Sequence, residues 1–336
     1  MAECLALVNE FKPDVIHVHG SERFYGLLRA RNCVKIPTLL SIQGLVSVIE
    51  RYIPGTLRMR ERWQTLSALE IATRRGWLWE KRSFRSASAR EIEILRGVDG
   101  IMGRTLWDHA HGSALSRGVK YFQGDELLRP EFYSGTWASD KCDRYSLLFT
   151  NAGSTKRDAH VLLEALRLLR NRYPAALLRL AGAGVFRGAY GKYLKRLARD
   201  LNCSGAIEEL GYLSAQELTR ELLRSHVFCI ASAIENSPNS LCEAMTVGTP
   251  SVSSYVGGIP SLGADGRELL FFPAGDAYLL AARISEIFES DSLANSLSSS
   301  CRARAKERHS SARVVGQVMG AYRALLSERT VRVSQR

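Results

Sequence analysis

Glu235-Asn-Ser-Pro-Asn-Ser-Leu-Cys-Glu243 sets two carboxylates eight positions apart in a loop-forming stretch. The apolar run Val227–Ile230 precedes it and is typical of a buried strand. Pro238 lacks an N–H and fits the first turn of a helix or the approach to it, so the sequence predicts a helix that begins near Asn239. Glu243 then falls on the first or second turn of that helix.

The predicted helix start has the features of an anion-binding site. Backbone N–H groups near Asn239 and Ser240 would point out of the helix N-terminus, where the helix dipole favours negative charge. The two carboxylates can accept hydrogen bonds from hydroxyl groups. A ligand that carries both phosphate and hydroxyls, such as a nucleotide sugar, fits this layout. The alternative is a capped helix whose two glutamates face solvent, which a bare E-x7-E pattern favours on its own.

The residues after Glu243 continue a longer pattern, with Ala-Met, then Val247-Gly-Thr-Pro250, a second apolar run and Gly257-Gly-Ile-Pro260. The order strand, Glu, Pro/Asn loop, Glu-Ala-Met, small-Gly-x-Pro, strand, Gly-Gly-x-Pro resembles the E-x7-E region of retaining glycosyltransferases of the GT-B fold. The similarity is greatest to glycosyltransferase family 4. It extends from Pro13 to about Leu326 and is strongest over residues 205–276.

The resemblance implies an α/β fold of two Rossmann-like, doubly wound domains, and the alternation of short strands with helices agrees with it. Residues 1–140 are expected to form an N-terminal, acceptor-side domain, and residues 141–312 a nucleotide-sugar-binding domain. Residues 313–328 are expected to form a helix that packs back toward the N-terminal domain, and residues 329–336 a basic tail.

The N-terminal domain is expected to be incomplete. Four short strands are predicted before residue 142, at Val15–His19, Thr38–Ile42, Asp99–Gly103 and Val119–Phe122. A complete domain of the resembled family has more strands, and it begins with one that leads to a Gly-rich loop at the acceptor site. Either the chain is an N-terminally shortened copy, or Met1 is not the true start.

Several donor-site residues follow from the resemblance. Ligands bind outside the carboxyl ends of the strands in doubly wound sheets, and Glu235, Gly153 and Gly211 all follow predicted strands. By resemblance, Glu243 would hold the ribose hydroxyls, and Glu235 would orient the transferred sugar. The backbone of Gly211 and Tyr212 would touch the nucleotide base.

The loop Asn151-Ala-Gly153-Ser-Thr-Lys156-Arg157-Asp158 follows a predicted strand and precedes a helix. The resembled family has Gly-Arg and, a few positions on, Lys-Gly in this loop, and the cations clamp the donor diphosphate. This sequence has two adjacent cations but no Lys-Gly pair, so Lys156 and Arg157 remain alternatives for the clamp. Two exposed basic residues at a helix start are the competing interpretation.

The candidates for the acceptor side are His19, Gly20 and Gln43, which lie at the ends of predicted strands. The resembled family more often has His where Gln43 stands, and Gln cannot carry a proton. His17 and His19 lie on one strand face, yet no third metal ligand is near in sequence. No D-x-D motif occurs, so no metal cofactor is expected, and the donor is expected to be UDP- or GDP-linked.

The net charge of +12 on 336 residues is concentrated in two segments. Residues 51–90 hold ten Arg/Lys and three Glu, and residues 302–336 hold nine Arg/Lys and two Glu, so each carries +7 and the rest −2. Residues 51–96 are predicted to be helical and include three tryptophans. Two interpretations stay open for 51–90: a helical hairpin with solvated arginines, or peripheral contact with an anionic membrane. No nucleic-acid-binding motif accompanies the charge, so no such partner is expected.

The expected location is cytoplasmic, with association at the inner face of the membrane as a further expectation. No uncharged apolar run reaches about 18 residues, so no transmembrane helix is expected. The acidic start Met-Ala-Glu-Cys lacks the basic region of a signal peptide. Seven scattered cysteines without a C-x-x-C pair indicate a reducing compartment.

The predicted function is hexosyl-type transfer from a nucleotide sugar to a hydroxyl of a glycan or lipid-linked acceptor, with retention at the anomeric carbon, in the synthesis of a cell-surface glycan or glycolipid. The alternative is a catalytically impaired or non-catalytic nucleotide-sugar-binding protein derived from such an enzyme, which the incomplete domain and Gln43 favour. A sugar-phosphate epimerase or phosphorylase is a third alternative, which the E-x7-E loop with Gly257-Gly258 disfavours.

Overall fold

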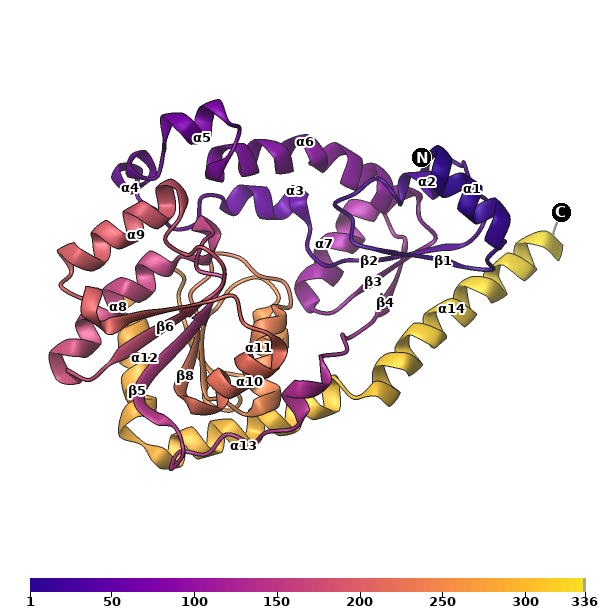
Figure 1. Ribbon diagram of the computed structural model, residues 1–336. Helices are drawn as coiled ribbons and strands as arrows, with labels where there is room; N and C mark the ends of the chain where they lie inside the picture. Colours follow the sequence, from indigo (N-terminus) through magenta and orange to yellow (C-terminus); the bar gives the residue numbers. More distant parts are fainter. Residues whose placement is uncertain (335–336) are drawn as a thin grey trace. The chain divides into compact units, whose positions relative to one another are not determined.

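The computed structural model describes residues 1–334 and divides the chain into two compact units (Figure 1). The first unit comprises Met1–Arg51, Arg82–Leu127 and the chain from Arg308 onward, and the second comprises Tyr52–Lys81 and Leu128–Glu307. Each unit contains one parallel sheet with helices packed against it. The predicted α/β fold is therefore confirmed.

The sheet of the first unit has four parallel strands in the order β1-β2-β3-β4. They are β1 (Ile16–His19), β2 (Thr38–Ser41), β3 (Gly100–Gly103) and β4 (Lys120–Gln123), and they confirm the four predicted strands to within one residue. The helices of this unit are α1 (Ala2–Phe11), α2 (Leu27–Ala30), α3 (Val46–Ile49), most of α6 (Gly76–Gly97), α7 (Leu106–Ser116) and α14 (Ser311–Ser334).

Both faces of the first sheet are covered. Successive residues of a strand point to opposite faces, so Leu40 packs with Ile94 of α6 on one face, and Leu39 packs with Leu325 of α14 on the other. α14 thus supplies the helix layer of the second face. This helix continues to Ser334 and includes the described part of residues 329–336, whereas residues 335 and 336 of the expected tail lie outside the described residues.

The sheet of the second unit has six parallel strands in the order β10-β9-β8-β5-β6-β7. They are β5 (Asp143–Thr150), β6 (Leu177–Ala181), β7 (Ile207–Gly211), β8 (Ser225–Ile230), β9 (Ser251–Ser254) and β10 (Leu270–Phe272). The helices of this unit are α4 (Met59–Gln64), α5 (Ala68–Ala72), α8 (Ala159–Arg172), α9 (Gly188–Asp200), α10 (Ala215–Arg224), α11 (Asn239–Val247), α12 (Ala277–Glu289) and α13 (Asp291–Arg308).

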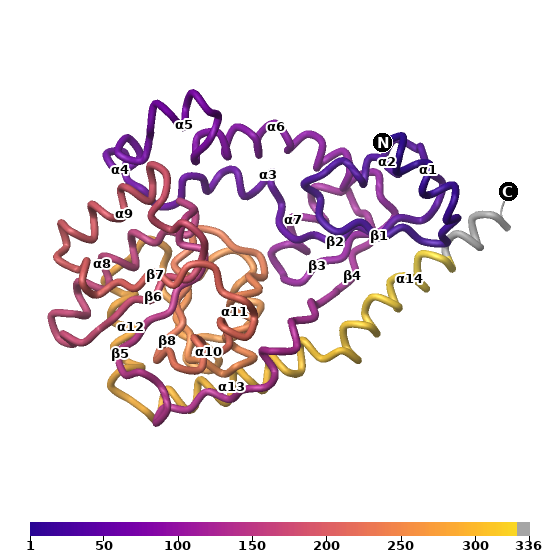
Figure 2. The backbone as a smooth tube through the Cα atoms, in the orientation of Figure 1, coloured from indigo at the N-terminus to yellow at the C-terminus, as the bar shows by residue number. Residues whose placement is uncertain are grey.

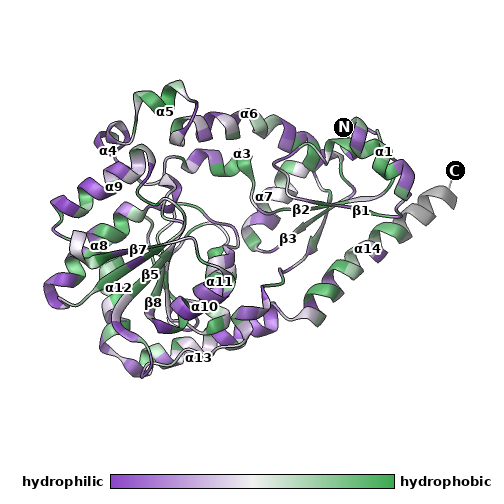
Figure 3. Ribbon diagram, viewed as in Figure 1, coloured by the Kyte–Doolittle hydropathy of each residue, from purple (hydrophilic) through white to green (hydrophobic). Residues whose placement is uncertain are grey.

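One apolar core supports the second sheet. All six residues of β8 are buried, and β5 buries the four residues from Ser146 to Phe149. Parallel strands that helices cover on both faces carry such nearly continuous apolar runs, which explains why the sequence predicts these strands well. Figure 3 shows the hydrophobic colour gathered on the strands of this sheet.

The residues predicted to be helical over 51–96 form three separate helices, α4, α5 and α6. The first two, and the first turns of α6 as far as Lys81, belong to the second unit. α4 lies beside α9 there (Figure 2). Among the residues that the structure describes, no helix is both long and apolar enough to cross a membrane.

His226 of β8 is a titratable group in the core of the second unit. It is fully buried, its Nδ1 accepts a hydrogen bond from the N–H of Tyr145 at 3.2 Å, and its ring stacks on Phe288. Burial lowers the pKa of His226 to about 4, and the charge of Arg144 acts in the same sense while that of Asp291 opposes it. The native state therefore holds this imidazole neutral.

We expect the free energy of unfolding to fall as the pH drops below about 6.5. In that range His226 is protonated in the unfolded chain but stays neutral in the folded protein. His226→Gln, which stays neutral, should remove about 2 kcal/mol of the stability change between pH 7 and pH 5. Urea unfolding of both proteins at the two pH values measures this. An unchanged pH dependence in the variant would contradict it.

Candidate functional site

The strand order of the second sheet indicates where a ligand binds. The chain adds β6 and β7 on one side of β5, and β8, β9 and β10 on the other, so the order reverses between β5 and β8. Ligands of doubly wound sheets bind outside the carboxyl ends of the strands at such a reversal. The loops 151–158 and 231–238, which follow β5 and β8, therefore form the candidate site. Both loops carry residues that the sequence predicts for the donor site.

The two alternatives for a phosphate-binding cation point in different directions. Arg157 forms an ion pair with Glu235, which joins the two loops. Nζ of Lys156 lies 2.6 Å from Oε1 of Glu80 in α6. The side chain of Arg157 is 25% exposed, burial lowers its pKa from the ordinary value, and the charge of Glu80 opposes that change. The structure thus brings Arg157, and not Lys156, together with Glu235.

Hydrogen bonds fix the loop that carries Glu235. The N–H of Gly258 donates to the backbone oxygen of Glu235 at 2.9 Å, and Oγ of Ser232 donates to Oε1 of Glu235 at 2.9 Å. The N–H of Ala233 donates to the backbone oxygen of Lys156 at 2.9 Å, which adds a main-chain link between the two loops. The ion pair therefore connects two loops that are already held side by side.

The helix after loop 231–238 begins at the predicted residue. α11 starts at Asn239 with Pro238 at its N-cap, and its first turn holds no acidic residue. Asn239 is exposed and Ser240 is half-buried, so the positive end of the helix dipole is open to an anion four or five residues after Glu235. The predicted helix start is thus confirmed, and its role in anion binding stays a prediction.

Glu243 lies on the second turn of α11 and is buried, with 6% of its surface exposed. Nη2 of Arg129 donates a hydrogen bond to Oε1 of Glu243 at 3.1 Å. Burial raises the pKa of Glu243, while the hydrogen bond and charge of Arg129 lower it. Arg129 could not be predicted from the sequence, because it lies 114 residues before Glu243 and an Arg-Pro pair gives no local signal.

The residues predicted for the nucleotide base lie at the same edge of the sheet. Gly211 ends β7 with a φ of 70°, and its backbone oxygen accepts a hydrogen bond from the N–H of Gly182 at 2.7 Å. Tyr212 follows and is 80% exposed. Gly153 lies beside Gly184, since a Cβ on Gly153 would be 4.0 Å from the backbone oxygen of Gly184. The loops after β5, β6 and β7 are thus neighbours.

The residues predicted for the acceptor side belong to the first unit. His19 ends β1, and the N–H of Gly20 donates to the backbone oxygen of Ser41 at 2.9 Å, while Gln43 is exposed two residues after β2. His17 packs under His19, and its two ring nitrogens are hydrogen-bonded to the hydroxyls of Tyr322 (2.8 Å) and Ser41 (2.7 Å). These bonds occupy both nitrogens of His17, so the His-x-His pair has no open metal-binding geometry.

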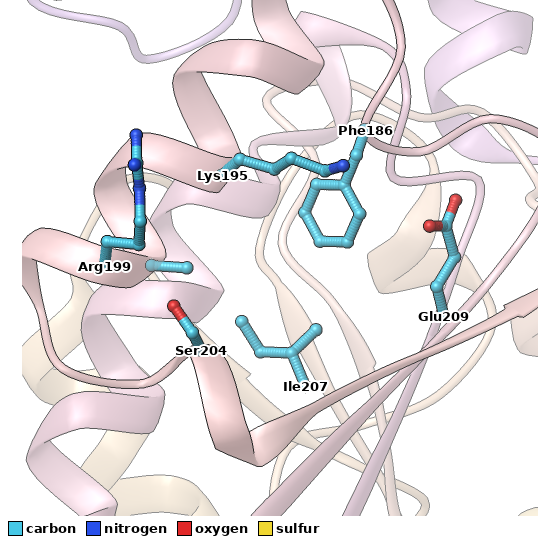
Figure 4. A pocket seen from close by; sticks show the side chains of 7 residues that line it. Phe186, Lys195, Arg199, Ser204, Ile207 and Glu209 are labelled. Carbon is cyan, nitrogen blue, oxygen red and sulfur yellow. The ribbon is translucent and has the colours of Figure 1, made fainter.

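Two cavities of the second unit lie apart from the candidate site. One, of about 480 Å³, lies between α9 and the edge strand β7, and Figure 4 shows the side chains of Phe186 and Ile207 turned into it, with Lys195 and Glu209 beside them. The other, of about 500 Å³, lies between α4 and α9. Neither has a lining residue in the loops after β5 and β8, so the candidate site rests on the loops and not on these cavities.

Comparison with known proteins identifies relatives of this chain. Residues 139–308, half of the chain, match the family model described as glycosyl transferases group 1. The colanic acid biosynthesis glycosyltransferase named WcaL in Salmonella typhimurium is 32% identical over 142 residues, which are 40% of this chain and 34% of WcaL. The D-inositol 3-phosphate glycosyltransferase of Corynebacterium urealyticum is 30% identical over 138 residues, 39% of this chain and 32% of that protein. The match thus spans about a third of the length of these relatives.

Solved structures share the fold over almost the whole chain. The sucrose-phosphate synthase of Thermosynechococcus elongatus superposes with a TM-score of 0.73 at 18% identity, over 96% of this chain and 76% of that one. HepE of Anabaena, in complex with UDP-glucose, superposes with a TM-score of 0.71 at 16% identity, over 96% of this chain and 81% of that one. At these identities the likeness establishes the GT-B fold.

Gly257 is the glycine on which the Glu235 loop depends most. Its φ is 52°, and a Cβ there would lie 1.9 Å from the backbone oxygen of Glu235. We expect Gly257→Ala to lower the free energy of unfolding by about 3 kcal/mol, from the left-handed conformation plus the collision. Gly266→Ala is the matched control, because its φ is 72° and its Cβ would meet open space. Gly266→Ala should lower the free energy of unfolding by only about 1 kcal/mol. If urea unfolding showed the same loss of stability in both variants, the collision with the backbone oxygen of Glu235 would be refuted.

Proposed function

The chain belongs to the family of glycosyl transferases group 1, and we propose that it transfers a sugar from a nucleotide sugar to an acceptor hydroxyl with retention of the anomeric configuration. One observation carries the proposal. The Arg157–Glu235 pair lies next to the N-terminus of α11, at the reversal of strand order where ligands of such sheets bind.

The proposed roles combine the charges at the site with the roles that the resemblance to glycosyltransferase family 4 implies for the two glutamates. Arg157 and the N–H groups of Asn239 and Ser240 bind the donor diphosphate, whose negative charge suits a guanidinium and a helix N-terminus. Glu243 accepts hydrogen bonds from the ribose hydroxyls. Glu235 accepts hydrogen bonds from the transferred sugar and orients it.

In the reaction, the bond between the anomeric carbon and the phosphate oxygen breaks, and the acceptor oxygen forms the new bond on the same face. The leaving diphosphate takes the electron pair of the broken bond, and one of its oxygens takes up the proton that the acceptor hydroxyl loses. The side chain of Arg157 and the dipole of α11 stabilise this charge as it develops, so catalysis rests on electrostatic stabilisation and positioning.

Donor binding requires Arg157 to exchange its ion-pair partner. Without donor, Glu235 neutralises Arg157 in a largely buried position, which limits the cost of burying either charge alone. An incoming diphosphate competes with Glu235 for Arg157. The carboxylate that it displaces is then available to the sugar hydroxyls, so one exchange of partners prepares both halves of the donor.

The conformation of Asp158 supports Arg157 as the clamp in place of Lys156. Asp158 has a φ of 52°, in the left-handed region that glycine favours. A cation followed by a left-handed residue reproduces the Lys-Gly pair of the family, with Arg157 for Lys and Asp158 for Gly. Lys156 then stands one position before the clamp.

Calorimetric titration of UDP, GDP and ADP into the whole chain tests the donor site. One of these nucleotides should bind, UDP and GDP being the expected ones. Arg157→Met and Glu243→Gln should each weaken binding about tenfold to a hundredfold, because each removes a charged hydrogen-bonding partner. Glu209→Gln, an exposed carboxylate on β7 outside the site, is the matched control and should bind as the parent does. Equal affinity in all four proteins would refute the assigned site.

Gln43 favours a second candidate function, a non-catalytic nucleotide-sugar-binding protein. It stands where the resembled family more often has His, and a carboxamide cannot take up the acceptor's proton. The two candidates predict the same nucleotide binding. They differ in whether the labelled sugar of a nucleotide sugar, incubated with the protein and a glycan or lipid-linked acceptor, appears in a glycoside product.

We propose that the acceptor is a glycan or lipid-linked glycan at the cytoplasmic face of a membrane, and that residues 58–79 contact that membrane. Six large apolar side chains in this stretch are exposed, out of nineteen such side chains among the described residues: Met59, Trp63, Leu69, Ile71, Leu78 and Trp79. Leu69 and Ile71 belong to α5, much of whose ribbon is green in Figure 3. Side chains of this kind enter the interfacial region of a bilayer.

Most basic side chains of the same stretch are exposed, whereas its acidic side chains are hydrogen-bonded within the protein. The exposed cations are Arg58, Arg60, Arg74 and Arg75, and in the part of the chain that the structure describes none of them forms an ion pair. The acids Glu61 and Glu70, and Glu80 directly after the stretch, instead accept hydrogen bonds from the protein itself. The outer surface is thus apolar and cationic, which suits anionic lipid headgroups.

Flotation with vesicles tests the membrane contact. The parent should bind vesicles with 30% phosphatidylglycerol more tightly than pure phosphatidylcholine, and Arg74→Gln with Arg75→Gln should weaken that binding by about fivefold for each charge removed. Lys192→Gln with Arg199→Gln on α9 is matched in charge, and no exposed large apolar residue of α9 accompanies it. Loss of binding in this control to the same extent, or indifference of the parent to lipid charge, would refute the proposed surface.

A further inference from the structure

Residues 52–81 belong to the second unit, although 46 residues of the first unit separate them in sequence from the rest of the second unit. We refer to them as the 52–81 segment. It closes on itself through a hydrogen bond from Nε1 of Trp77 to Oγ1 of Thr65 (3.2 Å) and one from Nζ of Lys81 to the backbone oxygen of Ile53 (3.1 Å). The segment is thus a folded element of the second unit, seen beside α9 in Figure 2.

The segment holds the residue that precedes Arg157. Nζ of Lys156 donates to Oε1 of Glu80 at 2.6 Å, and the two side chains are 23% and 29% exposed. An ion pair this short and partly shielded from water is stronger than a typical surface pair. Glu80 also acts on Arg157, since its charge raises the pKa of that guanidinium against the effect of burial.

The segment also holds the residue that follows Arg157. Asp158 is fully buried, and its carboxylate accepts a hydrogen bond from the N–H of Thr56. The nitrogen lies 3.0 Å from Oδ1 and 3.2 Å from Oδ2. Gly55 has a φ of 79°, and a Cβ there would lie 2.4 Å from the backbone oxygen of Thr155 and 2.2 Å from Oδ1 of Asp158. Only a glycine allows the segment to approach the loop this closely.

A third contact fastens the segment to the start of α9. Oε1 of Glu70 accepts the N–H of Ala189 at 2.8 Å, in the first turn of that helix. This carboxylate occupies the positive end of the helix dipole, where a negative charge is stabilising. The segment is therefore attached at three separate points, and two of them lie on either side of Arg157 in sequence.

We propose that Glu80 is a positioning residue of the donor site: by holding Lys156, while Thr56 holds Asp158, it fixes the backbone that carries Arg157 and so keeps the guanidinium beside Glu235. The inference rests on the proposed donor site. Glu80 itself does not touch the donor. An arginine side chain loses up to about 2 kcal/mol of conformational entropy when it is ordered, and a loop that is already fixed reduces what remains to be ordered on binding.

A competing role for Glu80 predicts the opposite sign. If Lys156 were the cation that binds the diphosphate, Glu80 would block it, and removing Glu80 would tighten nucleotide binding. If Glu80 positions Arg157, removing it weakens binding. The direction of one change in affinity therefore separates the two roles.

Charge exchange between Glu80 and Lys156 is the experiment. In the whole chain, Glu80→Lys and Lys156→Glu should each weaken binding of the nucleoside diphosphate that the parent binds by about tenfold, and the double variant should restore it to within about threefold. Glu286→Gln, which removes an exposed partner of Arg283 in the same unit, is the control and should bind as the parent does. Tighter binding in Glu80→Lys or Glu80→Gln, or no recovery in the double variant, would overturn the proposal.

Hydrogen exchange of the amides 153–158 separates this inference from the proposed function. Exchange there should be at least about tenfold faster in Glu80→Lys than in the parent, with recovery in the double variant and an unchanged melting temperature. If no nucleoside diphosphate binds to the parent, the donor assignment is wrong, and so is the proposed role of Glu80 in that site. Faster exchange in Glu80→Lys would then show only that Glu80 holds the loop 153–158 in place. Unchanged exchange in Glu80→Lys would refute the claim that Glu80 fixes the backbone around Arg157.

Discussion

The ion pair between Arg157 and Glu235 is the interaction on which the candidate site depends. It connects the loops after β5 and β8, the two strands between which the order of the second sheet reverses. Each charge is costly to bury alone, so each loop needs the other in order to hold its charged residue in place. The proposed chemistry uses the same pair, because a donor that takes Arg157 releases Glu235 for its sugar.

The surrounding structure makes that pair possible through close backbone approaches. Gly257 lets its chain pass against the backbone oxygen of Glu235, and Gly55 lets the 52–81 segment approach the loop that carries Arg157. Hydrogen bonds between main-chain groups, such as that from Ala233 to Lys156, hold the two loops together independently of the side chains. The second unit thus combines a rigid sheet edge with one exchangeable ion pair.

Local patterns in the sequence predicted what depends on local physics. The strands and the start of α11 at Asn239 followed from apolar runs and one proline, which also placed Glu243 on the first or second turn of that helix. Contacts between distant residues left no such signal. Arg129 reaches Glu243 across 114 positions and Glu80 reaches Lys156 across 76, and the choice between Lys156 and Arg157 depended on the direction of two adjacent side chains. Only the folded chain reveals these pairings.

A crystal structure of the chain with the nucleoside diphosphate that it binds tests the central claim most directly. The account predicts the diphosphate between Arg157 and the N-terminus of α11, the ribose hydroxyls on Glu243, and Glu235 parted from Arg157. A nucleotide bound elsewhere, for example in the cavity between α9 and β7, with the Arg157–Glu235 pair intact, would contradict the account.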